Sequence, residues 1–191
     1  MLAFFITAQR NNRRQPQRVA TVSIPFETTP IPPDPQESIM DSPEGVKTLT
    51  MKSQENSKGL TTYTLYVTAK DEPLKNSTFS REEPPGRSLE IPFNTWSVGN
   101  DYFFLKEKTS SGIQDLVFRS NGASATVDEE YVSVQKAFKE KLPGYAIEEV
   151  TGWADRTYLI VNTTELSKGK KVTFWFDIPS QTFSKLGTYF R

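Results

Sequence analysis

Carboxylates, lysines and hydroxyl groups are the side chains in this sequence that could carry out chemistry, because its 191 residues include no histidine and no cysteine. Their absence excludes Ser-His-Asp and Cys-His mechanisms, disulfide bonds and the usual zinc and iron–sulfur sites. A hydrolase built from this chain would need two carboxylates that converge across a cleft. The adjacent acids at 128–130 and 148–149 do not predict such a pair, since neighbours along a strand or helix point different ways. We therefore expect no enzymatic activity, no catalytic residue, no cofactor and no metal.

A binding surface is expected instead at Trp96, Asp155 and Arg156. These residues lie in or beside turns, and an indole ring there can stack on a sugar or a peptide. Asp155 is also the acid to suspect first if chemistry occurs, but its expected role is to accept backbone N–H bonds within its turn. Trp153 and Trp175 are expected to pack between structural units, because each belongs to an apolar segment.

The charge balance bears on the choice of partner. Lysine plus arginine and aspartate plus glutamate both number 23, which gives a formal net charge of zero. That balance offers no electrostatic reason to expect nucleic acid. A protein without net charge is prone to self-association, and the apolar fraction of 36% is enough for a sizeable core. The expected partner is a protein or a component of the cell envelope, and an oligomer is compatible with the sequence.

Residues 1–40 differ in composition from the rest of the chain. The apolar stretch 1–8 is shorter than the roughly 20 residues that cross a bilayer, and four arginines follow it. Seven prolines then fall between Pro16 and Pro43, where they disfavour both helix and central strand. We expect a disordered, Pro-rich tether behind an incomplete N-terminal membrane anchor. The alternative is a frayed terminus without a role. The folded domain is expected at 41–191.

The sequence from Asp41 onward predicts antiparallel hairpins joined by polar loops. The segments combine β-branched and aromatic residues with period-two alternation, which is typical of strands. They are 46–52 with 61–68, 102–107 with 114–119, and 157–162 with 171–178. A shorter strand at 89–93 contains Pro92, which argues for a sheet edge.

One helix is predicted between Asp128 and Leu142. Its apolar residues recur at helical spacing, and Pro143-Gly144 ends the pattern. The acids at 128–130 are expected in the first turn and Lys139 in the last, in agreement with the helix dipole. The apolar stripe is expected to face the core.

A turn recurs before each hairpin, at Ser42, Ser97 and Ala154, with spacings of 55 and 57 residues. Antiparallel strands repeated with a period near 50 are a signature of β-propeller blades. The segment from Ser42 to Lys47 resembles the S-P-D-G-K repeat of TolB-type and WD40-like propellers, and Trp96–Leu105 resembles its W-S-P-D-G/N-K-Y form. More closely, residues 41–191 resemble small membrane-anchored, propeller-like proteins of candidate-phylum bacteria. Val98-Gly99 and the third turn depart from the repeat.

The sequence thus predicts a mainly β fold of three antiparallel propeller-blade-like units with one inserted α-helix, preceded by the disordered tether. Three units are too few for a closed propeller, which has about four to eight blades. The domain is therefore either an open wedge or part of an assembly that other subunits complete. The expected function is a non-enzymatic, extracytoplasmic binding or scaffold module attached to the cytoplasmic membrane, with protein–protein interaction as its role. The alternatives are a carboxylate-dependent hydrolase acting on envelope glycan and a structural subunit of a surface assembly.

Overall fold

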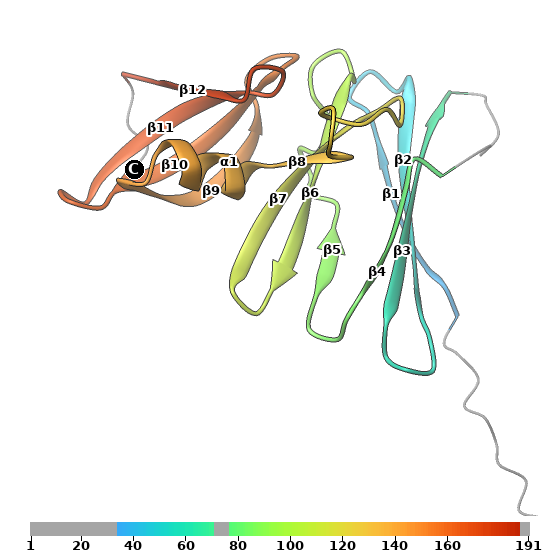
Figure 1. The fold of residues 1–191 in the computed structure, drawn as a ribbon. Coiled ribbons are helices and arrows are strands. Elements are labelled where there is room, and N and C mark those ends of the chain that lie inside the picture. The colour runs from blue at the N-terminus through green and yellow to red at the C-terminus, as the bar shows by residue number, and fades with distance from the viewer. Residues whose placement is uncertain (1–33, 71–76, 188–191) are drawn as a thin grey trace, which may run out of the picture. The chain divides into compact units, whose positions relative to one another are not determined.

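A computed structural model describes residues 34–70 and 77–187, which fall in one compact unit (Figure 1). Within them the chain forms three four-stranded antiparallel sheets and one α-helix. The prediction of a mainly β fold with an inserted helix is therefore confirmed. The apolar stub and most of the predicted tether lie outside the described residues.

The first sheet has the order β1-β2-β3-β4. Its strands are β1 (Gln36–Asp41), β2 (Lys47–Glu55), β3 (Thr61–Ala69) and β4 (Phe79–Glu83). Alternation along β2 and β3 buries apolar side chains on one face and leaves threonines on the other. The hairpin predicted between 46–52 and 61–68 is confirmed as β2 and β3.

Strand β1 moves the start of the domain upstream of the predicted boundary at Asp41. Residues 36–41 pair with β2 in an unbroken antiparallel register, from Gln36 opposite Ser53 to Asp41 opposite Thr48. The assignment of 36–40 to a disordered tether was therefore wrong. An edge strand needs a partner on one side only, so it forms directly after the proline-rich stretch that ends at Pro35.

The second sheet has the order β5-β6-β7-β8. Its strands are β5 (Ser88–Glu90), β6 (Tyr102–Thr109), β7 (Gly112–Arg119) and β8 (Tyr131–Ser133). The hairpin of β6 and β7 was predicted, and β5 occupies the predicted edge position and ends before Pro92. Four consecutive residues of β6, from Tyr102 to Leu105, are buried, because both faces of this sheet are covered.

The third sheet has the order β12-β11-β10-β9. Its strands are β9 (Tyr145–Trp153), β10 (Tyr158–Glu165), β11 (Lys170–Asp177) and β12 (Thr182–Lys185). The predicted third hairpin is confirmed as β10 and β11. On its inner face Leu159 lies opposite Phe176 and Val161 opposite Phe174, and all four side chains are buried.

The helix α1 (Val134–Lys141) is shorter than predicted. Tyr131 and Val132 pair with β7 as part of β8. These residues therefore belong to a strand, although their helical spacing predicted them in the first turns of the helix. Ser133 then caps the helix, its hydroxyl oxygen accepting from the backbone N–H of Lys136. The first turn accordingly contains no acid, which corrects that prediction, whereas Lys139 does lie in the last turn. The buried Val134 and Phe138 confirm that the helix faces the core.

Two apolar cores hold the sheets together, one between the first and second sheets and the other between the second and third. In one core Leu49 and Leu65 of the first sheet pack with Phe103 and Phe118 of the second. In the other core Phe104 of the second sheet packs with α1 and with the inner face of the third. The second sheet is therefore buried on both faces, and the first and third sheets each contribute one face.

Candidate functional site

The turns at Ser42 and Ser97 share one geometry. In the first, the backbone N–H of Lys47 donates to Ser42 Oγ (3.0 Å) and that of Ser42 donates to the Lys47 carbonyl (2.7 Å). In the second, Tyr102 N–H donates to Ser97 Oγ (3.0 Å) and Ser97 N–H to the Tyr102 carbonyl (3.0 Å). A left-handed residue occupies the equivalent position in both turns, Gly45 with φ 64° and Asn100 with φ 61°, and the second turn has a further left-handed residue at Gly99 (φ 79°). The two turns are therefore structural repeats.

The third turn keeps only part of this pattern. Ala154 N–H donates to the Tyr158 carbonyl (2.8 Å), but alanine offers no hydroxyl and the turn is one residue shorter. Asp155 Oδ1 accepts from the backbone N–H of Arg156 (2.8 Å). Asp155 thus has the turn-forming role expected of it, and its side chain is exposed.

A polar hollow of about 560 Å³, here called the basic hollow, lies beside these turns. Three cations and one carboxylate line it. Lys47 belongs to a strand of the first sheet, Arg119 to a strand of the second sheet, and Arg156 to the turn between β9 and β10 of the third sheet. Its lining residues are Lys47, Asp101, Tyr102, Arg119, Ser120, Asn121, Arg156 and Thr157. Of these residues, only Arg156 was expected from the sequence to belong to a binding surface.

Hydrogen bonds and ring contacts hold the cations of the basic hollow in place. The Lys47 ammonium donates to the Asn100 carbonyl (3.0 Å) and to Ser120 Oγ (2.8 Å). The Arg119 guanidinium lies 5.6 Å from the centre of the Tyr102 ring, a cation–π distance. Neither Lys47 nor Arg119 forms an ion pair with a carboxylate of the described residues.

Arg156 differs from the other two cations because it has an acidic partner. Its Nη2 lies 2.7 Å from Asp101 Oδ2, and this hydrogen bond raises the pKa of the Arg156 guanidinium. Its side chain is 65% exposed, so the pair is a surface ion pair of small energy. Asp101 therefore orients Arg156 at the rim of the basic hollow without burying it.

A second hollow of about 440 Å³, here called the apolar groove, is lined by side chains from β1, from β9 and from the β1–β2 and β5–β6 connections. Phe93 is 93% exposed and Val98 50% exposed, so both present apolar surface to a ligand. The remaining lining residues are Met40, Asp41, Pro43, Glu44, Asn94, Trp96 and Trp153.

Both tryptophans of the apolar groove are fixed by hydrogen bonds between sheets. Trp96 is only 5% exposed, and its Nε1 donates to the Met40 carbonyl at the end of β1 (3.1 Å). Trp153 Nε1 donates to the Thr95 carbonyl (3.0 Å). Trp96 is therefore mainly a core residue that contributes one wall of the groove, and it lines a different hollow from Arg156.

Gly152 lets β9 pass close to the apolar groove. Its φ is +137°, and a Cβ at this position would lie 2.3 Å from Asn94 Nδ2. Any larger residue would displace the Asn94 side chain and would have to adopt a backbone conformation that favours glycine. The glycine therefore sets the spacing between the third sheet and this wall of the groove.

Trp175 does not have the role expected from sequence. Its side chain is 39% exposed and lies on the outer face of the third sheet, where its ring is 5.7 Å from that of Tyr158. The prediction that it packs between structural units is wrong for the described residues. The residues on either side of it in β11, Phe174 and Phe176, point into the core instead.

A buried carboxylate that sequence analysis missed is Asp115, opposite Lys106 across β6 and β7. Burial raises its pKa above the ordinary value, as expected of a general acid, although Lys106 and Gln135 oppose the shift. Lys106 Nζ lies 3.3 Å from one carboxylate oxygen, and Gln135 Nε2 donates to the other (2.6 Å). The side chain is 2% exposed, so it is poorly placed to protonate a substrate. Its contacts are those of a structural acid.

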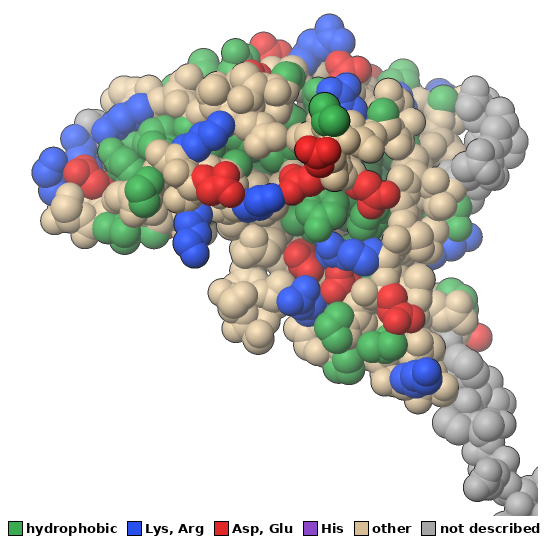
Figure 2. Space-filling view, viewed as in Figure 1, with side chains coloured by type: hydrophobic (Ala, Val, Ile, Leu, Met, Phe, Trp, Pro, Cys, Tyr) green, Lys and Arg blue, Asp and Glu red, His purple; other side chains and the backbone are tan. Residues whose placement is uncertain are grey.

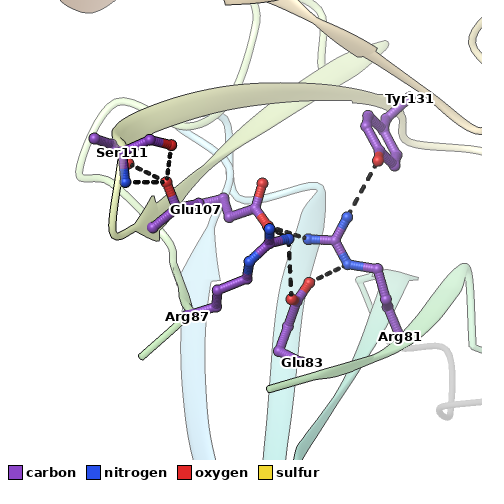
Figure 3. Close-up of polar contacts among 8 residues, drawn as sticks. Arg81, Glu83, Arg87, Glu107, Ser111 and Tyr131 are labelled. Atoms are coloured by element: carbon purple, nitrogen blue, oxygen red, sulfur yellow. Dashed lines mark hydrogen bonds and ion pairs between the residues drawn. The ribbon is translucent and has the colours of Figure 1, made fainter. Parts of the chain in front are cut away.

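Glu83 and Glu107 are two further buried acids, held between the first two sheets (Figure 3). Arg81 contacts both carboxylates and donates to the hydroxyl of Tyr131 (3.1 Å). Arg87 approaches the same two acids at 3.9 and 3.6 Å. Because arginines neutralise both acids, we assign this cluster to stability.

Charged side chains of both signs are mixed on the face shown in Figure 2, in keeping with zero net charge. The described residues contain no group of three or more acidic side chains placed to hold a metal ion. None of their helices is long and apolar enough to cross a membrane. In comparisons with known proteins, no family model, curated protein or solved structure matches this chain.

Proposed function

We propose that this protein is a non-enzymatic binding module whose apolar groove holds a segment of a protein partner. One observation supports the proposal most directly. The almost fully exposed Phe93 lines the same groove as Trp96 and Trp153, which form its walls. Aromatic side chains dominate the energy of protein interfaces when they are held rigidly before binding. Hydrogen bonds from both indoles fix these walls. An apolar side chain of the partner would fill the groove against them.

Replacing Phe93 with serine tests this function. Peptides selected from a displayed library on the full chain are expected to bind the Phe93→Ser variant at least about tenfold more weakly, because an exposed aromatic anchor contributes about 2 kcal/mol or more. The melting temperature is expected to stay unchanged, since Phe93 is 93% exposed. Affinity is measured by fluorescence anisotropy of labelled peptides.

The matched control is Ile113→Ser, which removes another exposed apolar side chain at the start of β7. It is expected to bind the selected peptides like the wild type. Peptides that bind Phe93→Ser and wild type equally would place the interaction elsewhere and refute the proposed groove.

The proposal includes a propeller-like arrangement, in which each four-stranded meander acts as one blade. Support comes from the repeated turns at Ser42 and Ser97 and from the packing of successive sheets through two cores. It further includes display outside the cytoplasmic membrane, on the N-terminal anchor and Pro-rich tether expected from residues 1–35. The relation to TolB-type and WD40-like repeats remains part of the proposal.

A second candidate function is self-assembly through the outer face of the third sheet. Ile160 lies directly opposite Trp175, and Tyr158, two residues from Ile160, shares their face. On the outer face of the first sheet, Ile39 is 60% exposed and lies opposite Thr50, which lies opposite Tyr66. In a dimer, the first sheet of each copy could pack on the third sheet of the other copy. The two copies together would have six sheets, and if each sheet acts as one blade this number lies within the usual range of about four to eight blades.

Replacing Trp175 with glutamate tests the assembly. The wild-type chain is expected to run as a dimer at micromolar concentration in size-exclusion chromatography with light scattering. Trp175→Glu is expected to run as a monomer, because it places a charge in an apolar interface. The control Val127→Glu changes a side chain that is 98% exposed in a loop and should leave the mass unchanged. A wild-type monomer at all concentrations would rule out this candidate.

A further inference from the structure

The basic hollow has a charge that the apolar groove does not explain. It gathers Lys47, Arg119 and Arg156 around a single carboxylate, Asp101. Three positive charges less one negative charge leave a net charge of +2 in the lining. Like charges repel, so such a convergence costs stability unless an anion offsets it. The net positive charge of the basic hollow therefore favours an anionic ligand.

The cations are separated in sequence and brought together by the fold. Lys47 begins β2 of the first sheet, Arg119 ends β7 of the second, and Arg156 lies in the turn that enters the third. Each structural unit therefore contributes one cation to the lining of the same hollow. The site therefore exists only in the folded domain, and its ligand would also stabilise the packing of the sheets.

The donors of the basic hollow are already oriented. An ammonium has three donors, and the two hydrogen bonds of Lys47 to Asn100 and Ser120 leave one for a ligand. Arg119 rests against the ring of Tyr102, which fixes the plane of its guanidinium. Both cations lack an ion pair within the described residues, so their charge is available to a bound group.

We propose that the basic hollow binds a phosphate monoester. This group has a charge of about −1.5 to −2 at neutral pH and three strong acceptor oxygens, which match the net charge of +2 and the three separate cationic donors. A carboxylate has one charge and two oxygens and matches less well. Guanidinium groups bind phosphate oxygens through paired N–H donors. The volume of about 560 Å³ also admits the molecule that bears the phosphate.

Calorimetric titration of the full-length protein tests the site with two probes, inorganic phosphate and a short peptide that contains one phosphoserine. The first probe represents a free phosphate compound, and the second a phosphorylated macromolecule. Binding of either supports the proposal and tells the two sources apart. Affinity for the phosphoserine peptide is expected to fall as pH decreases through about 6, where its phosphate loses the second charge, and affinity for both probes is expected to fall with added salt.

Charge-removing variants locate the site. Arg119→Gln and Arg156→Gln are each expected to weaken phosphate binding at least tenfold. Arg156 is 65% exposed, so its variant is expected to fold even if the change at the partly buried Arg119 impairs folding. Lys139→Gln is the control, because it removes the same charge from the exposed surface of α1, outside the hollow.

The outcomes are distinct. Binding that Arg156→Gln weakens and Lys139→Gln leaves unchanged supports the site. Absence of binding of both probes at millimolar concentration overturns it, as does equal weakening by the control variant. The inference is independent of the apolar groove, because Phe93→Ser leaves every residue of the basic hollow in place.

Discussion

Replacing Trp153 with alanine is expected to lower the free energy of unfolding by about 3 kcal/mol, the lower end of the range for large aromatic side chains truncated in cores, because its ring is partly buried. The indole ring ends β9 and packs on the second sheet, with ring centres 6.2 Å from Tyr102 and 6.3 Å from Phe104. Its N–H is also one of two donors to the Thr95 carbonyl, the other being the Phe104 N–H, and Thr95 is fully buried. The variant therefore loses packing between two sheets and leaves a buried carbonyl without this donor.

Two further variants separate these contributions in urea unfolding experiments. Trp153→Phe keeps a ring but removes the donor, and it is expected to cost about 0.5–1.5 kcal/mol, the net contribution of one hydrogen bond, because the Phe104 N–H still donates to the Thr95 carbonyl (3.0 Å). Phe93→Ala truncates an aromatic side chain that is 93% exposed and is expected to change stability by less than about 0.5 kcal/mol. If Trp153→Ala unfolded like the wild type, the indole would not hold the sheets together and its role would lie in binding alone.

The local features of the fold were predictable because each depends on residues close together in sequence. Ser42 and Ser97 mark equivalent turns, since a serine hydroxyl accepts the N–H five residues later in both. Alternation located the hairpins, and the continuous apolar segment of β6 reflects burial on both faces of the second sheet. These signals located the central hairpin of each of the three sheets.

Features that depend on pairing between distant segments were not predictable in the same way. Tyr131 has helical spacing to Val134 and Phe138, but its pairing with Phe118 draws it into β8. Residues 36–41 follow a Pro-rich segment, and only the register with β2 identifies them as a strand. Period-two alternation also does not say which face is outermost, so Trp175 was assigned to the interior.

The candidate sites show the same division. Arg156 was identified because it lies in a recognisable turn, whereas Lys47 and Arg119 carry no local signal of their own. Phe93 was read as part of a strand, yet the strand ends at Glu90 and leaves the ring exposed. Asp115 had a signal that sequence analysis passed over, namely an acid among apolar residues of a predicted strand.

Replacing Arg81 with methionine is expected to lower the free energy of unfolding by about 3–5 kcal/mol, because it leaves buried acids without their main counterion. Arg81 contacts Glu83, which is 2% exposed, and lies 2.9 Å from Glu107, which is 6% exposed. Its guanidinium also lies 5.8 Å from the ring of Phe79 and 5.7 Å from that of Tyr131. The side chain therefore connects β4 of the first sheet with β6 and β8 of the second (Figure 3).

The comparison with Arg87 tests whether burial of the charges is the cause. Arg87 approaches the same acids at longer distances and is 51% exposed, so Arg87→Met is expected to cost less than about 1 kcal/mol. A triple variant, Arg81→Met with Glu83→Gln and Glu107→Gln, removes the stranded charges together with the arginine. It is expected to recover part of the loss measured in urea for Arg81→Met, since uncharged groups cost less to bury than unpaired charges. A triple variant less stable than Arg81→Met would instead show that the two glutamates stabilise the sheets through contacts that do not depend on this arginine.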